Sequence, residues 1–354
     1  MQIQIYEKLD ADLLREIRMY LQTNTQVGAV SSDHDPRWLS VLTNALDHRT
    51  FVITARDEQQ LVGYLPLALV TSRLFGRFLV SLPYLNLAGV VAENDAVATA
   101  LITEASDLAR VHDVQYMELR HGNALPHENL TKQRDEKVRM VLDLPGDSDT
   151  LWNNLKAKVR NQIRKGDKFD LSMQWGGMDL LDDFYDVFAI NMRDLGTPVY
   201  PRKLFAQIVQ TFPDTAELGV VKHEGQAIAG AILIHDPLRE SGGITQVPSA
   251  STLRNFNHTN ANMWMYHHLL CRAIERGAGR FDFGRSSEDS GTYRFKKQWG
   301  ALPIPTVWQY HVRRGDINAV RPDSPKYKRR IETWQKLPVW VTRLVGPSIV
   351  RGIP

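Results

Sequence analysis

The sequence predicts an α/β protein made of two similar halves, each with a mixed β-sheet flanked by helices. The order strand, tight turn, strand, strand, helix, strand can be read twice along the 354 residues. In each copy the second strand is almost continuously apolar, which is typical of a strand buried on both faces. A helix that joins neighbouring strands favours a parallel pair and a tight turn favours an antiparallel one, so each sheet should contain both.

The elements follow from the spacing of apolar residues. The first copy has predicted strands at 50–55, 61–70 and 78–82, a helix over 96–112 and a strand at 115–120. The second copy has predicted strands at 216–221, 226–235 and 243–247, a helix over 260–276 and a strand at 280–285. We therefore expect two domains, residues 1–145 and 146–354.

Two basic segments lie outside the repeat. A helix is predicted over 151–168, where apolar residues recur every four positions: Leu151, Leu155, Val159 and Ile163. A second stripe of the same spacing is basic: Lys156, Arg160 and Arg164. The tail, residues 326–354, is predicted to be a basic amphipathic helix interrupted at Pro338, and we expect its apolar face to pack on the protein rather than on a membrane.

Composition limits the class of protein. Hydrophobic residues make up 43% and charged residues 23%, which is typical of a folded chain rather than a disordered one. A single cysteine excludes an internal disulfide framework. The longest uncharged stretch, 78–92, is too short and too interrupted to span a bilayer, and the first ten residues do not resemble a signal peptide. We expect a cytoplasmic protein.

The small net charge of +3 hides an uneven distribution. Residues 294–354 carry 13 basic and 3 acidic side chains, and residues 151–168 carry six and one. The remainder of the chain is therefore acidic. Two basic segments on an acidic body suggest a polyanionic partner, although each run alone is typical of a solvated face.

Several well-known catalytic motifs are missing. The sequence has no phosphate-binding G-x-x-x-x-G-K-S/T or G-x-G-x-x-G, no G-x-S-x-G nucleophile elbow, no H-E-x-x-H and no paired C-x-x-C. His267 and Cys271 have a spacing that could ligate metal, but the helix around them is apolar, so we expect a buried histidine and no metal site.

The densest polar cluster is residues 281–301, FDFGRSSEDSGTYRFKKQWGA. A predicted strand ends at Gly284 and a polar loop follows, which is where ligands bind in open α/β sheets. Arg285 could hold a carboxylate or phosphate, and Lys296 could stabilise an oxyanion. The alternative is an ordinary surface loop.

This cluster resembles the second-domain motif of FemAB-like aminoacyl and acyl transferases, roughly F-D-F-G-R followed by F-K-x-x-F/W-G, and the repeat resembles tandem GNAT-type acyltransferase domains. Residues 72–91 and 191–201 look like members associated with exosortase/PEP-CTERM exopolysaccharide systems. The resemblance implies transfer of an acyl or aminoacyl group onto an amine, with Phe295 and Lys296 at the transfer centre. It also implies substrate-binding residues in the matching blocks: Asp282, Arg285, Tyr293, Arg193 and Tyr200.

The resemblance implies an acyl donor, aminoacyl-tRNA or acyl-CoA, rather than a fixed cofactor. Lys156, Arg160 and Arg164 would contact a polyanionic donor, and the acceptor would be an amine-bearing envelope or polysaccharide precursor at the inner face of the membrane. The sequence departs from the family in two places: residues 252–260 lack the glycines of the CoA-binding loop, and no lysine occurs in the four residues after Trp38, where cell-wall members have one. Two alternatives therefore stay open: an atypical acyl-CoA N-acetyltransferase, and a non-catalytic scaffold of polysaccharide assembly that docks through its tail on a membrane or partner.

Overall fold

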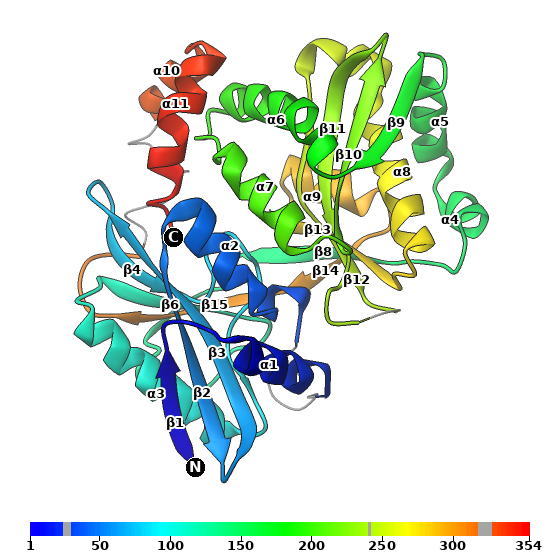
Figure 1. The fold of residues 1–354 in the computed structure, drawn as a ribbon. Helices are drawn as coiled ribbons and strands as arrows, with labels where there is room; N and C mark the ends of the chain where they lie inside the picture. Colours follow the sequence, from blue (N-terminus) through cyan, green and yellow to red (C-terminus); the bar gives the residue numbers. More distant parts are fainter. Residues whose placement is uncertain (24–29, 240–241, 318–327) are drawn as a thin grey trace. The chain divides into compact units, whose positions relative to one another are not determined.

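The chain forms two compact units, each built on one mixed β-sheet flanked by helices (Figure 1). The computed structural model describes residues 1–23, 30–239, 242–317 and 328–354. Unit 1 comprises Met1–Lys137, Pro305–Ser324 and Ser348–Pro354, and unit 2 comprises Val138–Ile304 and Pro325–Pro347. The predicted fold class, α/β with two mixed sheets, is confirmed.

The sheet of unit 1 has the order β1-β2-β3-β4-β6-β15-β7, with β5 paired to β3. Its strands are β1 (Gln2–Tyr6), β2 (Arg49–Asp57), β3 (Gln60–Ser72), β4 (Gly76–Val80), β5 (Val91–Ala92), β6 (Tyr116–His121), β7 (Lys132–Arg134) and β15 (Val307–Val312). Its helical segments are α1 (Ala11–Thr23), η1 (Ser32–His34), α2 (Arg37–Leu46) and α3 (Asp95–Val111). The strands β4 and β6, which α3 connects, are parallel.

The sheet of unit 2 has the order β14-β8-β13-β12-β11-β10-β9. Its strands are β8 (Lys137–Asp143), β9 (Leu171–Gly176), β10 (Ala216–His223), β11 (Gln226–Ile234), β12 (Ile244–Thr252), β13 (Arg280–Ser287) and β14 (Leu302–Pro305). Its helical segments are α4 (Ser148–Asn154), α5 (Ala157–Gly166), η2 (Met178–Leu180), α6 (Leu181–Leu195), α7 (Arg202–Thr211), η3 (Arg254–Thr259), α8 (Ala261–Glu275) and α9 (Gly291–Lys297). The tail forms α10 (Lys328–Gln335) and α11 (Val339–Val350), and residues 326 and 327 of the predicted tail helix lie outside the described residues.

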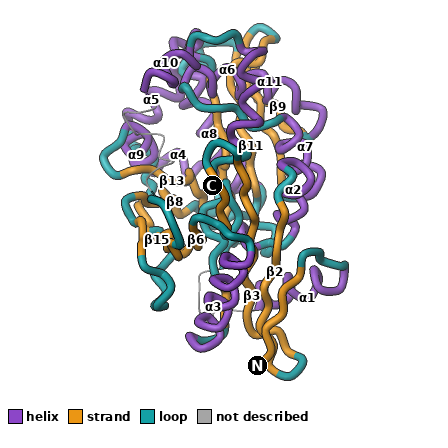
Figure 2. Tube along the Cα trace, turned by 90° about the vertical axis from the view of Figure 1, so that its left-hand side faces the viewer, coloured by secondary structure: helices purple, strands orange, loops and turns teal. Residues whose placement is uncertain are grey.

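The repeat predicted from the sequence is present in both units. β2-β3-β4-α3-β6 and β10-β11-β12-α8-β13 have the same order, and β12 and β13, like β4 and β6, are parallel. The helices lie close to the strands: a Cβ on Gly63 of β3 would lie 2.6 Å from Val97 Cγ1 of α3. In unit 2, α6 and α8 cover opposite faces of the sheet (Figure 1), and Figure 2 shows α8, α9 and α5 on one side of the strands.

Three local predictions are wrong. The basic helix over 151–168 is two helices, because Leu155 and Lys156 adopt extended backbone angles between α4 and α5. Its apolar stripe survives the break, since all four of its residues join the core beneath α8. The strand β13 runs past Gly284 to Ser287, and residues 291–297 of the predicted polar loop form the helix α9. Residues 307–312, assigned to the second half, form β15 in the sheet of unit 1 between β6 and β7.

No described helix is long and apolar enough to cross a membrane.

A partly buried ionic network ties together the starts of β10 and β12 and the end of β11. Glu217 accepts hydrogen bonds from His235 Nε2 (2.8 Å) and from both Nε and Nη2 of Arg272 (2.8 and 2.9 Å). Burial alone would raise the pKa of Glu217, but these hydrogen bonds lower it to about 2. Burial lowers the pKa of His235, which therefore stays neutral and accepts a hydrogen bond from Thr245 at its other ring nitrogen.

We expect Glu217→Gln to destabilise unit 2 at pH 7 by about 2 kcal/mol, because it removes the carboxylate that pairs with the half-buried Arg272 and leaves that guanidinium only its outer ion pair with Glu275. A carboxylate with a depressed folded-state pKa stabilises the protein above its unfolded pKa and loses that contribution as the pH falls toward 2. As the pH is lowered from about 6 to about 3, the free energy of unfolding of the wild type should therefore fall more than that of the variant. Urea unfolding midpoints measured across this range check the prediction, and parallel curves for the two proteins would contradict it.

Candidate active site

The parallel pairing between β12 and β13 in unit 2 stops before either strand ends. It joins Ile244, Thr245 and Gln246 to Arg280, Phe281 and Asp282. Beyond this point β12 continues to Thr252 and β13 to Ser287, with no further pairing between these described segments. Backbone groups on the diverging edges must therefore find other partners.

The side chain of Lys296 supplies such partners for β13. Its Nζ donates to the carbonyl oxygens of Gly284 (3.0 Å) and Arg285 (3.1 Å). Successive carbonyls of a regular strand point in opposite directions, so one amine does not normally reach both. Gly284 has a φ of +79°, a left-handed conformation that breaks the alternation. The glycine and the lysine therefore form one local arrangement at the point where the strands diverge.

Lys296 is 8% exposed, which is unusual for a lysine. Burial lowers the pKa of its ammonium group to about 8, and the negative charge of Asp282 opposes that shift. An ammonium group has three N–H donors and two of them are used by the carbonyls. One donor is left for a ligand, and the ammonium loses a proton close to neutral pH.

Aromatic side chains surround the helix that carries Lys296. Phe295 packs edge-on against Tyr266 of α8, with ring centroids 4.9 Å apart, and Trp299 lies 6.4 Å from Phe295. Tyr266 also stacks on Phe283 of β13. These contacts fix α9 against α8 and β13, and they provide the apolar surroundings that keep Lys296 dry.

Two further polar groups lie on β13, on either side of Gly284 and Arg285 in the sequence. Asp282 is buried, accepts from Arg139 Nη2 at 2.7 Å and also accepts from the Gly284 amide at 2.8 Å. It therefore supports the backbone at Gly284 rather than presenting an open carboxylate. Ser286 is 4% exposed, and its Oγ has no hydrogen-bond partner among the described residues. A buried unpaired hydroxyl needs an explanation, and a ligand or water at this position is one.

The equivalent position in unit 1 is closed by the protein itself. There the last parallel pair is Val80 with Glu118, and β4 ends at Val80. The loop that follows folds onto β6, where the buried Arg120 donates to the carbonyl oxygens of Leu82 (3.4 Å) and Leu85 (2.6 Å). Arg120 also forms an ion pair with Glu118. Unit 1 therefore satisfies its diverging strands internally, and no lysine from a following helix takes part.

The structure brings some of the sequence-predicted residues together and leaves others apart. Arg285, Phe295 and Lys296 lie at the ends of β13 and α9, and Tyr293 is buried in the core of unit 2. Arg193 lies on α6, where its guanidinium contacts Asp194 and the carbonyl oxygen of Leu337 in the tail. Tyr200 stacks on Phe188 of the same helix. Arg193 and Tyr200 therefore belong to the α6 side of the sheet and not to the surroundings of Lys296.

The three basic residues predicted to bind a polyanion have different roles. Arg160 Nη1 donates to the carbonyl oxygens of Leu155 (2.9 Å), Asn153 (3.1 Å) and Trp152 (3.4 Å), so it caps the end of α4. Lys156 lies at the N-cap of α5 and is exposed. Arg164 is also exposed, and its guanidinium lies 5.3 Å from the centroid of the Trp152 ring. Of these three, Lys156 and Arg164 remain candidates for contact with a polyanion.

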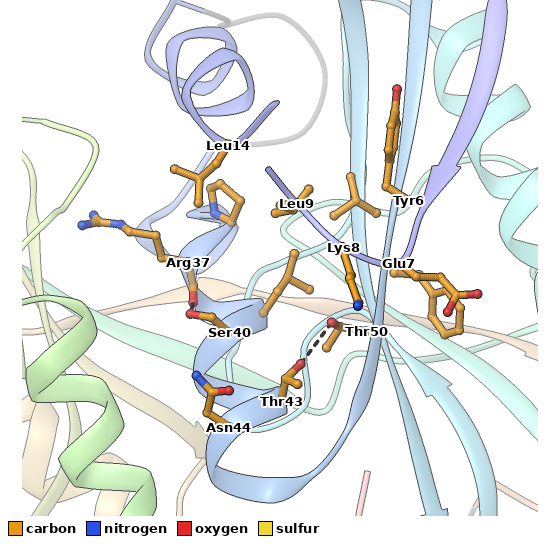
Figure 3. Close-up of a pocket in the computed structure, with 14 residues that line it drawn as sticks. Tyr6, Glu7, Lys8, Leu9, Leu14, Arg37, Ser40, Thr43, Asn44 and Thr50 are labelled. Carbon is orange, nitrogen blue, oxygen red and sulfur yellow. Dashed lines mark hydrogen bonds between the residues drawn. The ribbon is translucent and has the colours of Figure 1, made fainter. Parts of the chain in front are cut away.

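Unit 1 contains a pocket of about 300 Å³ that sequence reasoning missed (Figure 3). Its lining comes from β1, α1, α2, β2 and the segments beside them, and it includes Lys8, Asn44 and the hydroxyl pair Thr43–Thr50 (3.2 Å) over an apolar floor. The lining contains no histidine or cysteine. Because it is assembled from several separate segments, no local sequence pattern could have identified it.

No group of three or more His, Cys, Asp or Glu residues in the described part of the chain could hold a metal ion.

A comparison with known protein families matches the part of the chain that contains Lys296. Residues 153–297 match the family described as acetyltransferase (GNAT) domain, a range that includes β12, β13 and Lys296. No curated protein matches the chain. The crystal structure of FemX is similar at 13% identity, with 88% of this chain and 97% of FemX covered and a TM-score of 0.63.

Two further solved structures share the arrangement. A tandem GNAT protein from the clavulanic acid biosynthesis pathway is 11% identical, covering 87% of this chain and 98% of that one at a TM-score of 0.55. The C-terminal domain of a putative lysylphosphatidylglycerol synthetase from Agrobacterium fabrum is 11% identical, covering 85% and 92% at a TM-score of 0.54. These likenesses show a tandem GNAT-like fold.

We expect Gly284→Ala to displace Lys296, because a side chain at this left-handed position is strained by about 1–2 kcal/mol. Relief of that strain would move the Gly284 and Arg285 carbonyls that hold Lys296 Nζ. The variant should have a lower thermal midpoint, and Lys296 should react faster with an amine-modifying reagent at pH 8, as detected by peptide mass spectrometry. Gly277→Ala is the matched control, since Gly277 has a φ of +75° in a turn with open space around it. Equal labelling of Lys296 in both variants would contradict the role of Gly284.

Proposed function

We propose that this protein is an acyltransferase that moves an acyl or aminoacyl group onto an amine, with its transfer centre at Lys296 of unit 2. The observation that carries the proposal is the buried lysine held by two backbone carbonyls at the point where β12 and β13 diverge. The match of residues 153–297 to an acetyltransferase domain supports it, because that range contains Lys296. The closure of the equivalent position in unit 1 supports a single transfer centre in unit 2.

The chemistry requires little from the protein beyond positioning and charge. The acceptor amine attacks the carbonyl carbon of the donor, so a carbon–nitrogen bond forms and a negative charge develops on the carbonyl oxygen. The third N–H of the Lys296 ammonium would donate to that oxyanion, in dry surroundings where such a bond stabilises most. The ester or thioester bond then breaks, and the leaving oxygen or sulfur takes the proton that the nitrogen loses. No covalent intermediate on the enzyme is needed.

Aminoacyl-tRNA is the donor that we propose first. Exposed Lys156 and Arg164 supply positive charge on and beside α5. The segment before α8 lacks glycine, and Asn260 at its N-cap makes no side-chain capping bond and has a φ of 56°. A GNAT-type pyrophosphate cradle is usually glycine-rich, so this segment fits a CoA donor less well. Acyl-CoA remains the second candidate, favoured by the acetyltransferase description of the matched family.

The acceptor that we propose is an amine-bearing precursor of the cell envelope or of an exopolysaccharide, used at the cytoplasmic side of the membrane. Support for this comes from the likeness of residues 72–91 and 191–201 to members associated with PEP-CTERM systems. FemX and the lysylphosphatidylglycerol synthetase domain share the fold.

We expect Lys296→Ala to lower kcat by about 10²–10³, because it removes the oxyanion donor. Lys297→Ala is the matched control: Lys297 is exposed, and its Nζ lies 5.5 Å from the centroid of the Tyr293 ring. Transfer is measured with radiolabelled acetyl-CoA and with a charged tRNA pool as donors. Undiminished turnover by a folded Lys296→Ala variant would remove the lysine from the mechanism, and a failure of the wild type to bind either donor would favour the scaffold alternative.

We expect the rate of transfer at saturating substrate to fall as the pH rises above about 8, toward tenfold per pH unit, because Lys296 then loses the proton that stabilises the oxyanion. The Lys296→Arg variant keeps its charge over this range. Its profile should therefore lack the alkaline decline even if its absolute rate is lower. If the pH–rate profiles of the wild type and of Lys296→Arg decline equally above a pH of about 8, a group other than Lys296 causes the decline.

A further inference from the structure

The tail is fixed to unit 2 along one side. Ile331 of α10 packs against Gly196 after α6, and Gln335 Nε2 donates to the carbonyl oxygen of Asp194 at 3.1 Å. Arg343 of α11 forms a 2.6 Å ion pair with Asp186 of α6. A Cβ on Gly346 would lie 2.8 Å from the backbone nitrogen of Val199. The tail helices therefore have a defined inner side, which faces α6 and the segment that follows it.

The outer side of α11 carries large apolar side chains that no other described residue covers. Trp340 is 68% exposed and Leu344, one helical turn later, is 71% exposed. Val345 beside them is 41% exposed. The sequence-based expectation that the apolar face packs on the protein is therefore met only in part. Burying these side chains in an apolar phase is favourable, so a surface of this kind marks an interaction site.

The segment that forms α10 and α11 is positively charged. Residues 328–347 contain five basic side chains and one acidic one, and Arg329, Arg330 and Lys336 are exposed. A second copy of the chain would bring like charges together at this surface, which is unfavourable. An anionic surface would be attracted to it. Tryptophan is enriched at the headgroup level of bilayers because its ring is amphipathic.

We propose that the outer side of α11, formed by Trp340, Leu344 and Val345, docks the protein on an anionic lipid bilayer, with Arg329, Arg330 and Lys336 contacting the headgroups. The 12 residues of α11 reach about 18 Å, which is shorter than the ~30 Å apolar core of a bilayer, so the helix lies on the membrane. The inference does not depend on the proposed transferase activity. It identifies a lipid surface as a partner, whichever donor and acceptor the site uses.

The test is co-sedimentation of the full chain with vesicles of phosphatidylcholine and phosphatidylglycerol, and with vesicles of phosphatidylcholine alone. We expect binding to the anionic vesicles, and about a tenfold or larger fall in the partition coefficient for the Trp340→Ala/Leu344→Ala variant. Leu74→Ala is the matched control, because Leu74 is an equally exposed leucine (76%) in unit 1. Arg329→Glu/Lys336→Glu should weaken binding and reduce its sensitivity to salt. Unchanged thermal midpoints confirm that the variants fold.

Three results would overturn the proposal. Equal binding of the wild type and the Trp340→Ala/Leu344→Ala variant would show that α11 does not insert. Equal binding to both vesicle compositions would show that the basic side chains do not contribute to membrane binding, and that the bilayer need not be anionic. Concentration-dependent self-association without lipid, abolished by the same double variant, would assign the surface to a second copy. Because none of these measurements uses turnover, a failure here leaves the transferase proposal untouched.

Discussion

Everything distinctive about the candidate site depends on two parallel strands that stop pairing before they end. The edges of β12 and β13 expose backbone groups that cannot remain unsatisfied inside a protein. Lys296 meets this requirement for two carbonyls, and in doing so it becomes a buried cation with a lowered pKa. The aromatic packing of Phe295, Tyr266 and Trp299 maintains the dry surroundings that this state needs. The same side chain therefore satisfies the backbone of β13 and provides the buried ammonium group that could stabilise an oxyanion.

The two units show how one topology meets this demand in two ways. Glu118 and Asp282 occupy the same register position, and each is buried beside an arginine. In unit 1 that arginine is Arg120 on the same strand, and it ties down the loop after β4. In unit 2 the arginine is Arg139 on β8, so the position equivalent to Arg120 can be Gly284, and the lysine can approach.

The sequence predicted most of what depends on local periodicity and little of what depends on distant segments. Both hairpins, both parallel crossovers and the catalytic candidates on β13 and α9 follow from short patterns. The sequence does not predict the helix break at Leu155 and Lys156, because the apolar residues keep their four-residue spacing across it. The pairing of Asp282 with Arg139, 143 positions apart, and the contact of Arg193 with the tail leave no local trace. The left-handed backbone of Gly284 is also set by its surroundings, since glycine merely permits it.

The return of β15 to the sheet of unit 1 also constrains how the chain can fold during synthesis. β15 lies between β6 and β7, so until residue 312 has been made β6 has an open edge and β7 has no neighbour. All of Val138–Ile304, most of unit 2, is synthesised before that strand. N-terminal domains usually fold first on the ribosome. Here the first sheet cannot be completed until every strand of the second sheet, β14 included, has been synthesised.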